Sequence, residues 1–354
     1  MTTDAVGGVW PYVLDLAGAL APLGVDTTLA VMGPPPAPDQ EAEALAVPGL
    51  RVLRTALPLD WLAEDAGSIR AAGEALAGLA ADAGAEVVHL NSPANAAGVR
   101  WPVPVVGVAH SCVATWWDAV KEGPLPEDFR WRAALTAEGY RAVDRLVVPS
   151  DAFGADTARV YALPRRPVAV HNGRRLLPVR APADGAPARF ALTAGRLWDE
   201  GKGMAALDTA AALCRVPVLA AGAAEGPNGT RAVLPHLQLL GRMPEAVLGG
   251  WMTAASVFVS TALYEPFGFA VLEAVRAGCA PVLSDIASFR EIWGDAAVFV
   301  PPGDAAAIAA AVDALCADEA RREAVVAAAR ERAGRYTAER MAAAMLEVYR
   351  EVAR

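Results

Sequence analysis

Short apolar runs rich in Val, Leu and Ala alternate with longer helical patterns through both halves of the chain. Strands that are apolar without interruption are buried on both faces, and their alternation with helices is typical of parallel sheets. The predicted strands of the first half are 27–32, 86–91, 103–110, 145–150 and 167–172, and those of the second half are RFALTAG, VPVLAAG, LQLLG, SVFVST, APVLSD and AVFVPP. The predicted helices include 9–23, 66–83, 151–162, 203–214, 268–278 and 304–334. The sequence therefore predicts an α/β fold with a doubly wound sheet in each half.

The length of the chain favours two domains. It has 354 residues, 55% of them hydrophobic, whereas a single core stops growing near about 250 to 300 residues. The segment LLPVRAPADGAPAR, 176–189, replaces periodicity by Pro and Ala and is typical of a semi-rigid linker. We expect one Rossmann-like domain over 1–175, a second over 190–336, and a terminal segment over 337–354. Two such domains facing each other across a cleft would bind ligands at the carboxyl ends of their strands.

The charge of the chain argues against several classes of partner. The formal net charge is −9, and each half carries more acidic than basic residues. Neither half has the basic stripe that nucleic acid requires, so no nucleic-acid partner is expected. The acidic first half also has no general attraction to anionic lipid, although a local patch for peripheral membrane contact stays open.

The cysteines and the hydropathy pattern indicate the compartment. Cys112, Cys214, Cys279 and Cys316 are widely spaced and include no CxxC pair, which argues against disulfides and structural zinc. No run of about 18 apolar residues predicts a membrane span, and no signal peptide is recognisable. We therefore expect a cytoplasmic protein that is at most membrane-peripheral.

The first ten residues predict a strand-turn-helix unit with almost no strand. MTTDAVGGVW resembles the end of a strand, a Gly-Gly turn and the start of a helix, but almost nothing precedes it. Either the first strand is very short or the true start lies a few residues upstream.

Two acids follow a predicted strand of the second half. In TALYEPFGFAVLEAVRAGCAPVLSD, 261–285, Glu265 lies in the loop after the strand, and Glu273 lies about one turn into the next helix. The free N–H groups at a helix start favour oxygen ligands, and a carboxylate accepts two hydroxyl hydrogen bonds. The pattern favours a ligand rich in diols, such as a sugar or a nucleotide.

This stretch resembles the donor-site motif of the retaining family-4 glycosyltransferases, which have the GT-B fold. The resemblance implies that Glu273 holds the ribose hydroxyls of a nucleotide. It also implies that Glu265, with the backbone of Pro266, Phe267 and Gly268, holds the transferred sugar and phosphate.

Two further segments of the second half match the family. In TAGRLWDEGKG, 193–203, the resemblance implies that Arg196 and Lys202 clamp the donor diphosphate, and two fixed cations would stabilise its departure. These two residues stand one position further apart than the family pattern leads us to expect. LLGRMP resembles the loop whose backbone meets the nucleobase, and its candidate residues are Gly241, Arg242 and Met243.

The first half supplies the remaining candidates. DAVGGVWPYV, with Gly7 and Gly8, resembles the loop that approaches the donor phosphate, because glycine permits close backbone approach. His110 ends a predicted strand and aligns with the family's histidine beside the transferred sugar, where a neutral imidazole can bond a hydroxyl. Asn172 and Gly173 are interpreted as a turn near the hinge.

The last helix is also expected to follow the family. Met341, Met345, Val348 and Val352 form a stripe at helical spacing, and the resemblance implies that this helix crosses back to pack on the first domain. Because the candidates come from both halves, the complete site is expected to form only when the cleft closes.

The resemblance implies a retaining glycosyltransferase that moves a sugar from a nucleotide-sugar donor to a hydroxyl acceptor. The acceptor would attack on the face from which the diphosphate leaves, and the diphosphate would help to deprotonate it. No cofactor and no metal are expected, since cations and helix N-termini do that work. A GT-B nucleotide-sugar epimerase, a glycogen-synthase-type polymerase and a non-catalytic nucleotide-sugar-binding protein remain alternatives.

Overall fold

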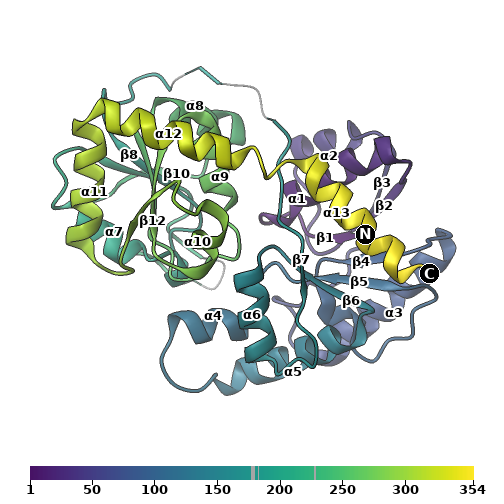
Figure 1. The fold of residues 1–354 in the computed structure, drawn as a ribbon. Coiled ribbons are helices and arrows are strands. Elements are labelled where there is room, and N and C mark those ends of the chain that lie inside the picture. Colours follow the sequence, from purple (N-terminus) through teal and green to yellow (C-terminus); the bar gives the residue numbers. More distant parts are fainter. Residues whose placement is uncertain (177–179, 182, 227–228) are drawn as a thin grey trace. The chain divides into compact units, whose positions relative to one another are not determined.

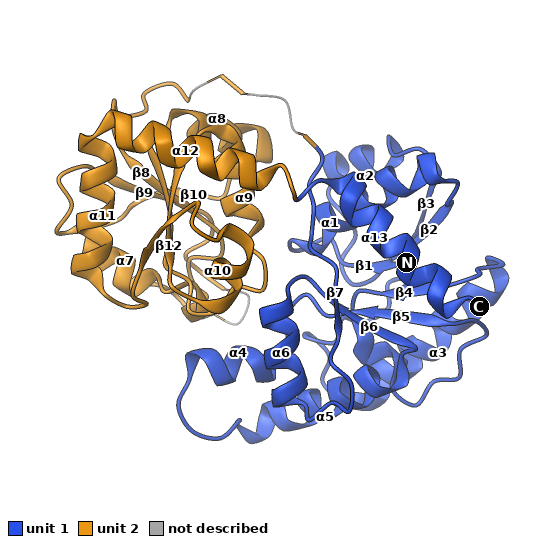
Figure 2. Ribbon diagram, in the orientation of Figure 1, with its two compact units in different colours: residues 1–175, 336–354 blue, residues 176–335 orange. Residues whose placement is uncertain are grey.

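The chain divides into two compact units, which are described separately. A computed structural model describes residues 1–176, 180–181, 183–226 and 229–354. Unit 1 comprises Met1–Arg175 and Tyr336–Arg354, and unit 2 comprises Leu176–Arg335 (Figure 2). Residues 177–179 and 182 of the predicted linker lie outside the described residues.

Unit 1 contains parallel strands in two adjoining sheets. Their bounds are β1 Thr2–Thr3, β2 Thr27–Val31, β3 Leu50–Arg54, β4 Val88–Leu90, β5 Val105–Val108, β6 Arg145–Val148 and β7 Val168–Ala169. One sheet has the order β1-β2-β3 and the other β4-β5-β6-β7. Asn91 joins them, because its backbone N–H donates to Thr2 Oγ1 (3.0 Å) and its side-chain amide to Thr2 O (2.7 Å). The strand order therefore reverses between β1 and β4, and in doubly wound folds ligands bind at such a switch point.

The helices of unit 1 pack around these strands. They are α1 Val9–Leu20, α2 Pro38–Leu45, α3 Ala66–Asp82, α4 Val113–Val120, α5 Glu127–Ala142, α6 Asp151–Val160 and α13 Ala338–Val352, with 3-10 turns η1 Ala21–Leu23 and η2 Pro93–Ala96. The helix predicted over 9–23 changes to a 3-10 turn at its end, where Pro22 occupies an N-terminal position of η1. The last helix, α13, lies beside α1 (Figure 1) and buries Met341, Met345 and Val348.

The two chain segments that connect the units pair with each other inside unit 1. The N–H of Arg174 donates to Tyr336 O (3.1 Å), and the N–H of Ala338 donates to Arg174 O (3.3 Å). A Cβ on Gly173 would lie 2.0 Å from Thr337 O, so this close approach requires glycine. The Arg174 side chain is buried and forms an ion pair of 2.9 Å with Asp15 of α1.

Unit 2 is one parallel six-stranded sheet with helices on both faces. Its strands are β8 Ala191–Ala194, β9 Val218–Ala221, β10 Gln238–Gly241, β11 Val257–Ser260, β12 Ala280–Ser284 and β13 Val298–Val300, in the order β10-β9-β8-β11-β12-β13. Its helices are η3 Glu200–Lys202, α7 Met204–Ala211, α8 Glu245–Ala254, α9 Phe269–Ala277, α10 Ala287–Trp293, α11 Ala305–Ala317 and α12 Glu319–Ala333. In Figure 1, α7 and α11 lie on the opposite side of the sheet from α8 and α9. The order reverses between β8 and β11.

The sequence pattern explains why this sheet is buried. Val257 and Val259 pack into the core with α7 and α11, and Phe258 between them is also buried. The strand is therefore covered on both faces, as its unbroken apolar run predicts.

The single helix predicted over 304–334 is wrong. Asp318 interrupts it, because its carboxylate accepts the N–H of Arg321 (2.9 Å) and caps the start of α12.

Candidate active site

The loops that leave β8 and β11 meet at the switch point of unit 2. The N–H groups of Leu263 and Tyr264 donate to Gly201 O at 2.9 and 3.1 Å. Thr261 Oγ1 lies 3.0 Å from Gly203 O and donates to the same turn. Gly203 has a φ of +64°, and a Cβ there would lie 2.1 Å from Thr261 O. Glycine is needed there for both reasons, and the two loops are held together.

This contact brings two of the predicted site residues together. Lys202 Nζ lies 2.6 Å from Glu265 Oε2, and the side chains are 22% and 18% exposed. Charged hydrogen bonds of this length are strong, especially when they are partly shielded from water. Lys202 is the last residue of η3, a 3-10 turn in the loop that follows β8.

Arg196 is oriented by Asp199, which is not among the predicted site residues. Its guanidinium donates to Asp199 Oδ2 (2.9 Å), and the other oxygen, Oδ1, accepts the N–H of Gly201 (3.0 Å). Asp199 is 8% exposed, whereas Arg196 is 59% exposed. A buried acid therefore holds one side of an exposed cation. The sequence signal was an Asp three residues after the Arg, at the N-cap of η3.

The Pro-Phe-Gly turn leads directly into α9. Gly268 is the N-cap of this helix with a φ of +97°, which favours glycine, and a Cβ there would lie 3.0 Å from a Phe289 ring atom. Phe267 is buried and stacks edge-on against Phe269 at 5.4 Å between ring centroids. The carbonyl of Glu265 accepts a hydrogen bond from Ser288 Oγ (2.6 Å), which holds the turn against α10.

Glu273 lies one turn into α9 and is half-buried, as predicted for a helix acid near the loop. Pro266 is buried together with Phe267 in the preceding turn. The structure therefore places Glu265 and Glu273 on the same strand-loop-helix unit, and their division of roles stays a prediction.

Glycines end three adjacent strands of unit 2. Gly195 follows β8, Gly222 follows β9, and Gly241 ends β10. A Cβ on Gly222 would lie 1.8 Å from Gly195 O, so no other residue fits there without rearrangement. Gly222 also donates its N–H to Gly241 O (2.8 Å). Arg242 follows as an exposed residue and Met243 as a half-buried one.

In unit 1, His110 follows β5 at the switch point. Its Nε2 lies 2.7 Å from Asn91 Oδ1, and its ring packs edge-on against Tyr12 at 4.5 Å between centroids. Burial lowers the pKa of His110 to about 4. The imidazole is therefore neutral at pH 7, as the proposed contact with a hydroxyl requires.

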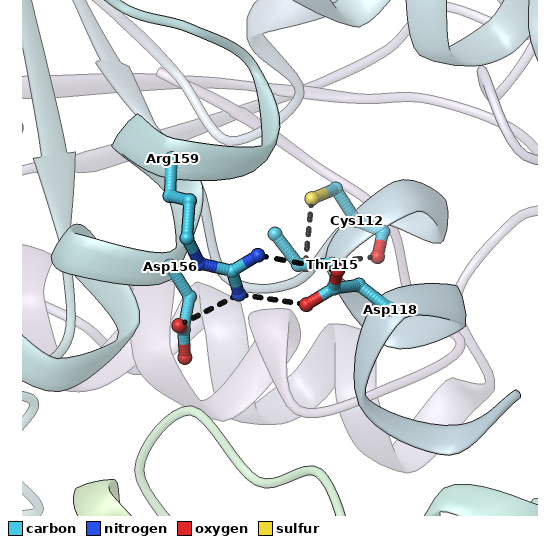
Figure 3. A network of polar contacts seen from close by, with 5 residues as sticks. All are labelled: Cys112, Thr115, Asp118, Asp156 and Arg159. Atoms are coloured by element: carbon cyan, nitrogen blue, oxygen red, sulfur yellow. Dashed lines mark hydrogen bonds and ion pairs between the residues drawn. The ribbon is translucent and has the colours of Figure 1, made fainter. Parts of the chain in front are cut away.

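The helix after His110 is anchored to its neighbour. In α4, which begins two residues after Ser111, Asp118 accepts two hydrogen bonds from Arg159 of α6 at 3.2 and 2.7 Å (Figure 3). Asp156 accepts a third at 3.1 Å, and Cys112 Sγ lies 2.8 Å from Thr115 Oγ1 in the first turn of α4. The two bonds between Asp118 and Arg159 hold α4 against α6.

Gly7 and Gly8 are exposed, and Gly8 is the N-cap of α1. A Cβ on Gly7 would meet nothing within 4 Å. Nothing in unit 1 requires glycine at position 7, so its proposed close approach to a ligand stays a prediction.

The described residues also bear on the metal, disulfide and membrane expectations. Within 1–176, 180–181, 183–226 and 229–354, no three His, Cys, Asp or Glu side chains form a cluster that could hold a metal ion. None of the four cysteines, all of which are described, forms a disulfide. Among the helices that the structure describes, none combines the length and the apolar character needed to cross a membrane.

Two family models match the chain. The model described as Glycosyltransferase Family 4 matches residues 6–176, and the model described as Glycosyl transferases group 1 matches residues 230–332. The two matched regions lie in different units and together include most of the predicted site residues.

Relatives and solved structures agree with these matches. A phosphatidyl-myo-inositol mannosyltransferase of Mycolicibacterium smegmatis is 38% identical over 120 residues, which are 33% of this chain and 31% of the relative. The match thus spans about a third of that relative. A D-inositol 3-phosphate glycosyltransferase of Xylanimonas cellulosilytica is 28% identical over 98% of this chain and 92% of its own length. The structure of Anabaena HepE in complex with UDP-glucose has a TM-score of 0.74 at 16% identity, covering 99% of this chain and 98% of that one. This likeness confirms the predicted GT-B-like α/β fold.

Proposed function

The chain belongs to the family 4 glycosyltransferases, and we propose that it transfers a sugar from a nucleoside-diphosphate donor to a hydroxyl of an acceptor, with retention of anomeric configuration. The observation that carries the proposal is the ion pair of Lys202 and Glu265. It joins the loops after β8 and β11 at the switch point of unit 2, beside the start of α9.

In this proposal, the cations act on the leaving group. The bond between the anomeric carbon and the diphosphate oxygen breaks, and the diphosphate gains negative charge. Arg196, which is exposed and held by Asp199, and Lys202, which is held by Glu265, bind that charge. Because both cations are anchored before the donor arrives, little reorganisation is needed in the transition state.

The remaining candidates hold the two ends of the donor. Glu273 accepts hydrogen bonds from the ribose diol, and Glu265 accepts one from the transferred sugar. The turn over 266–268 brings backbone N–H groups of the α9 N-terminus to the phosphate. Neutral His110 bonds a hydroxyl of the sugar. The acceptor oxygen then forms its bond to the anomeric carbon on the face that the diphosphate leaves, and its proton passes to a diphosphate oxygen.

The relatives define which donors and acceptors to test. One is named as a mannosyltransferase acting on phosphatidyl-myo-inositol, another as a glycosyltransferase acting on D-inositol 3-phosphate, and HepE was crystallised with UDP-glucose. We infer a nucleotide-sugar donor and a polyol or sugar hydroxyl as acceptor. Contact with a membrane surface would follow only if the acceptor is a lipid.

The test begins with a thermal-shift screen of UDP-, GDP- and ADP-sugars, because a bound donor stabilises the folded state according to its concentration over its Kd. The best donor is then incubated with inositol phosphate, phosphatidylinositol vesicles and simple sugars, and products are analysed for glycoside, free sugar and epimer. Glycoside with retained configuration supports the proposal. Epimer formation, or donor binding without turnover on any acceptor, would contradict it in favour of an epimerase or a binding protein.

A further inference from the structure

Asn91 occupies the switch point of unit 1, directly after β4. Its side-chain amide lies 2.7 Å from Thr2 O, and its Oδ1 lies 2.7 Å from His110 Nε2 and 3.1 Å from His89 Nε2. Asn91 therefore contacts the first strand and two imidazoles at once.

These partners decide the orientation of the amide. Thr2 O only accepts hydrogen bonds, so the group facing it must be the NH₂ of Asn91. The group facing the two imidazoles is then the carbonyl oxygen, which also only accepts. Consequently Nε2 of both His89 and His110 must carry a hydrogen.

The tautomer of His89 agrees with its second partner. With hydrogen on Nε2, neutral His89 has an acceptor at Nδ1, and Tyr349 Oη lies 2.6 Å from that atom. Burial raises the pKa of the Tyr349 hydroxyl, so it keeps its proton and donates. Burial also lowers the pKa of His89 to about 3, which keeps the ring neutral.

The ring planes are restrained as well. Tyr12 of α1 packs edge-on against His110 at 4.5 Å between centroids and lies 6.1 Å from the His89 ring. Tyr349 of α13 packs edge-on against His89 at 6.0 Å. The setting of the His110 imidazole thus depends on residues from strands β1, β4 and β5 and from helices α1 and α13.

We propose that Asn91, His89 and Tyr349 are positioning residues that fix His110 as the Nε2–H tautomer, so that its Nδ1 presents an acceptor to a hydroxyl of the donor sugar. This inference rests on the proposed function for the role of the hydroxyl, but the tautomer is a property of the protein alone. Tyr349 acts through two other residues, and its helix comes from the far end of the chain.

The first experiment measures the tautomer in the unmodified protein. The chain contains four histidines, so long-range ¹H–¹⁵N correlation spectra of histidine-labelled protein at pH 7 contain four imidazoles. Single His→Gln variants assign them. We expect both His89 and His110 to be neutral with hydrogen on Nε2. Hydrogen on Nδ1 of His110, or an imidazolium at either position, would overturn the proposal.

The second experiment removes one hydroxyl. Tyr349→Phe keeps the packing but deletes the donor to His89 Nδ1, and we expect a mixture of His89 tautomers and a roughly 2- to 10-fold lower kcat, the range of one hydrogen bond. The Kd for nucleoside diphosphate should not change, because the residues expected to hold the nucleobase, the ribose and the charge of the diphosphate lie in unit 2. Tyr140→Phe is the matched control, because it removes the hydroxyl of another buried tyrosine, which lies in α5 and packs its ring on Tyr161.

The outcomes separate this inference from the proposed function. If the parent transfers sugar and Tyr349→Phe matches it in kcat and in the His89 spectrum, the positioning role is wrong. Should Tyr349→Phe fail to fold, the spectra of the parent still decide the tautomer. A parent that shows the predicted tautomers but transfers no sugar contradicts the proposed function and leaves the hydrogen-bond assignment standing.

Discussion

At the scale of single residues, the two acids of the loop and helix after β11 have different surroundings. Glu265 is paired with Lys202, whereas Glu273 lies within α9. We expect Glu273→Ala to weaken binding of free nucleoside diphosphate by about 1.5–3 kcal/mol, the range for hydrogen bonds to a charged group. Glu265→Ala should spare that binding, because Lys202 remains available to phosphate, and should lower transfer. Isothermal titration and turnover measured on both variants check this. Parental nucleotide affinity in Glu273→Ala, or a loss of nucleotide binding together with transfer in Glu265→Ala, would refute the division.

The glycines offer a matched pair for testing function against stability. Gly203→Ala places a Cβ 2.1 Å from Thr261 O at a φ of +64°, so we expect a loss of stability of at least about 1–2 kcal/mol from the backbone conformation alone. Gly7→Ala meets no atom within 4 Å and should leave the melting temperature unchanged. If the loop at Gly7 approaches the donor phosphate, the added methyl group should slow sugar transfer even though stability is unchanged. Parental turnover by stable Gly7→Ala would remove Gly7 from the site.

At the scale of elements, the buried ion pair of Asp15 and Arg174 fastens α1 to the segment that connects the units. The side chains are 1% and 2% exposed, and the atoms are 2.9 Å apart. Asp15→Asn keeps the shape but leaves the Arg174 charge buried without its counter-charge, so we expect a loss of about 3–5 kcal/mol. Glu138→Gln is the control, because its 2.6 Å pair with Arg70 is exposed and should be worth at most about 1 kcal/mol. Urea unfolding compares them, and equal losses would show that burial does not matter here.

At the scale of the whole molecule, the buried His89 and the half-buried His110 make stability depend on pH. The pKa of His110 is lowered to about 4 and that of His89 to about 3, whereas an unfolded histidine titrates near 6.5. Between these values the unfolded chain binds protons that the folded chain does not. Stability is therefore complete above about pH 6.5 and falls as the pH is lowered, down to about 4 for His110 and about 3 for His89. Each histidine contributes a slope of about 1.4 kcal/mol per pH unit in that window. His110→Gln should remove one such slope from unfolding free energies measured between pH 4.5 and 6.5, and an unchanged slope would contradict a neutral His110 ring in the folded protein.

The sequence by itself determined the fold class and most of the candidate positions in unit 2, because those features depend on local pattern. Strands such as 257–260 show their two-sided burial in an unbroken apolar run, and Gly268 with the acids around it forms one continuous segment. Asp199 was missed, although it lies three residues from Arg196, because its role depends on a turn that closes in space. Only the tertiary structure could join Tyr349, His89 and Asn91 to His110, because 260 positions separate Tyr349 from His89. Hydrogen bonds over such separations depend on which strands and helices become neighbours, and no local pattern encodes that choice.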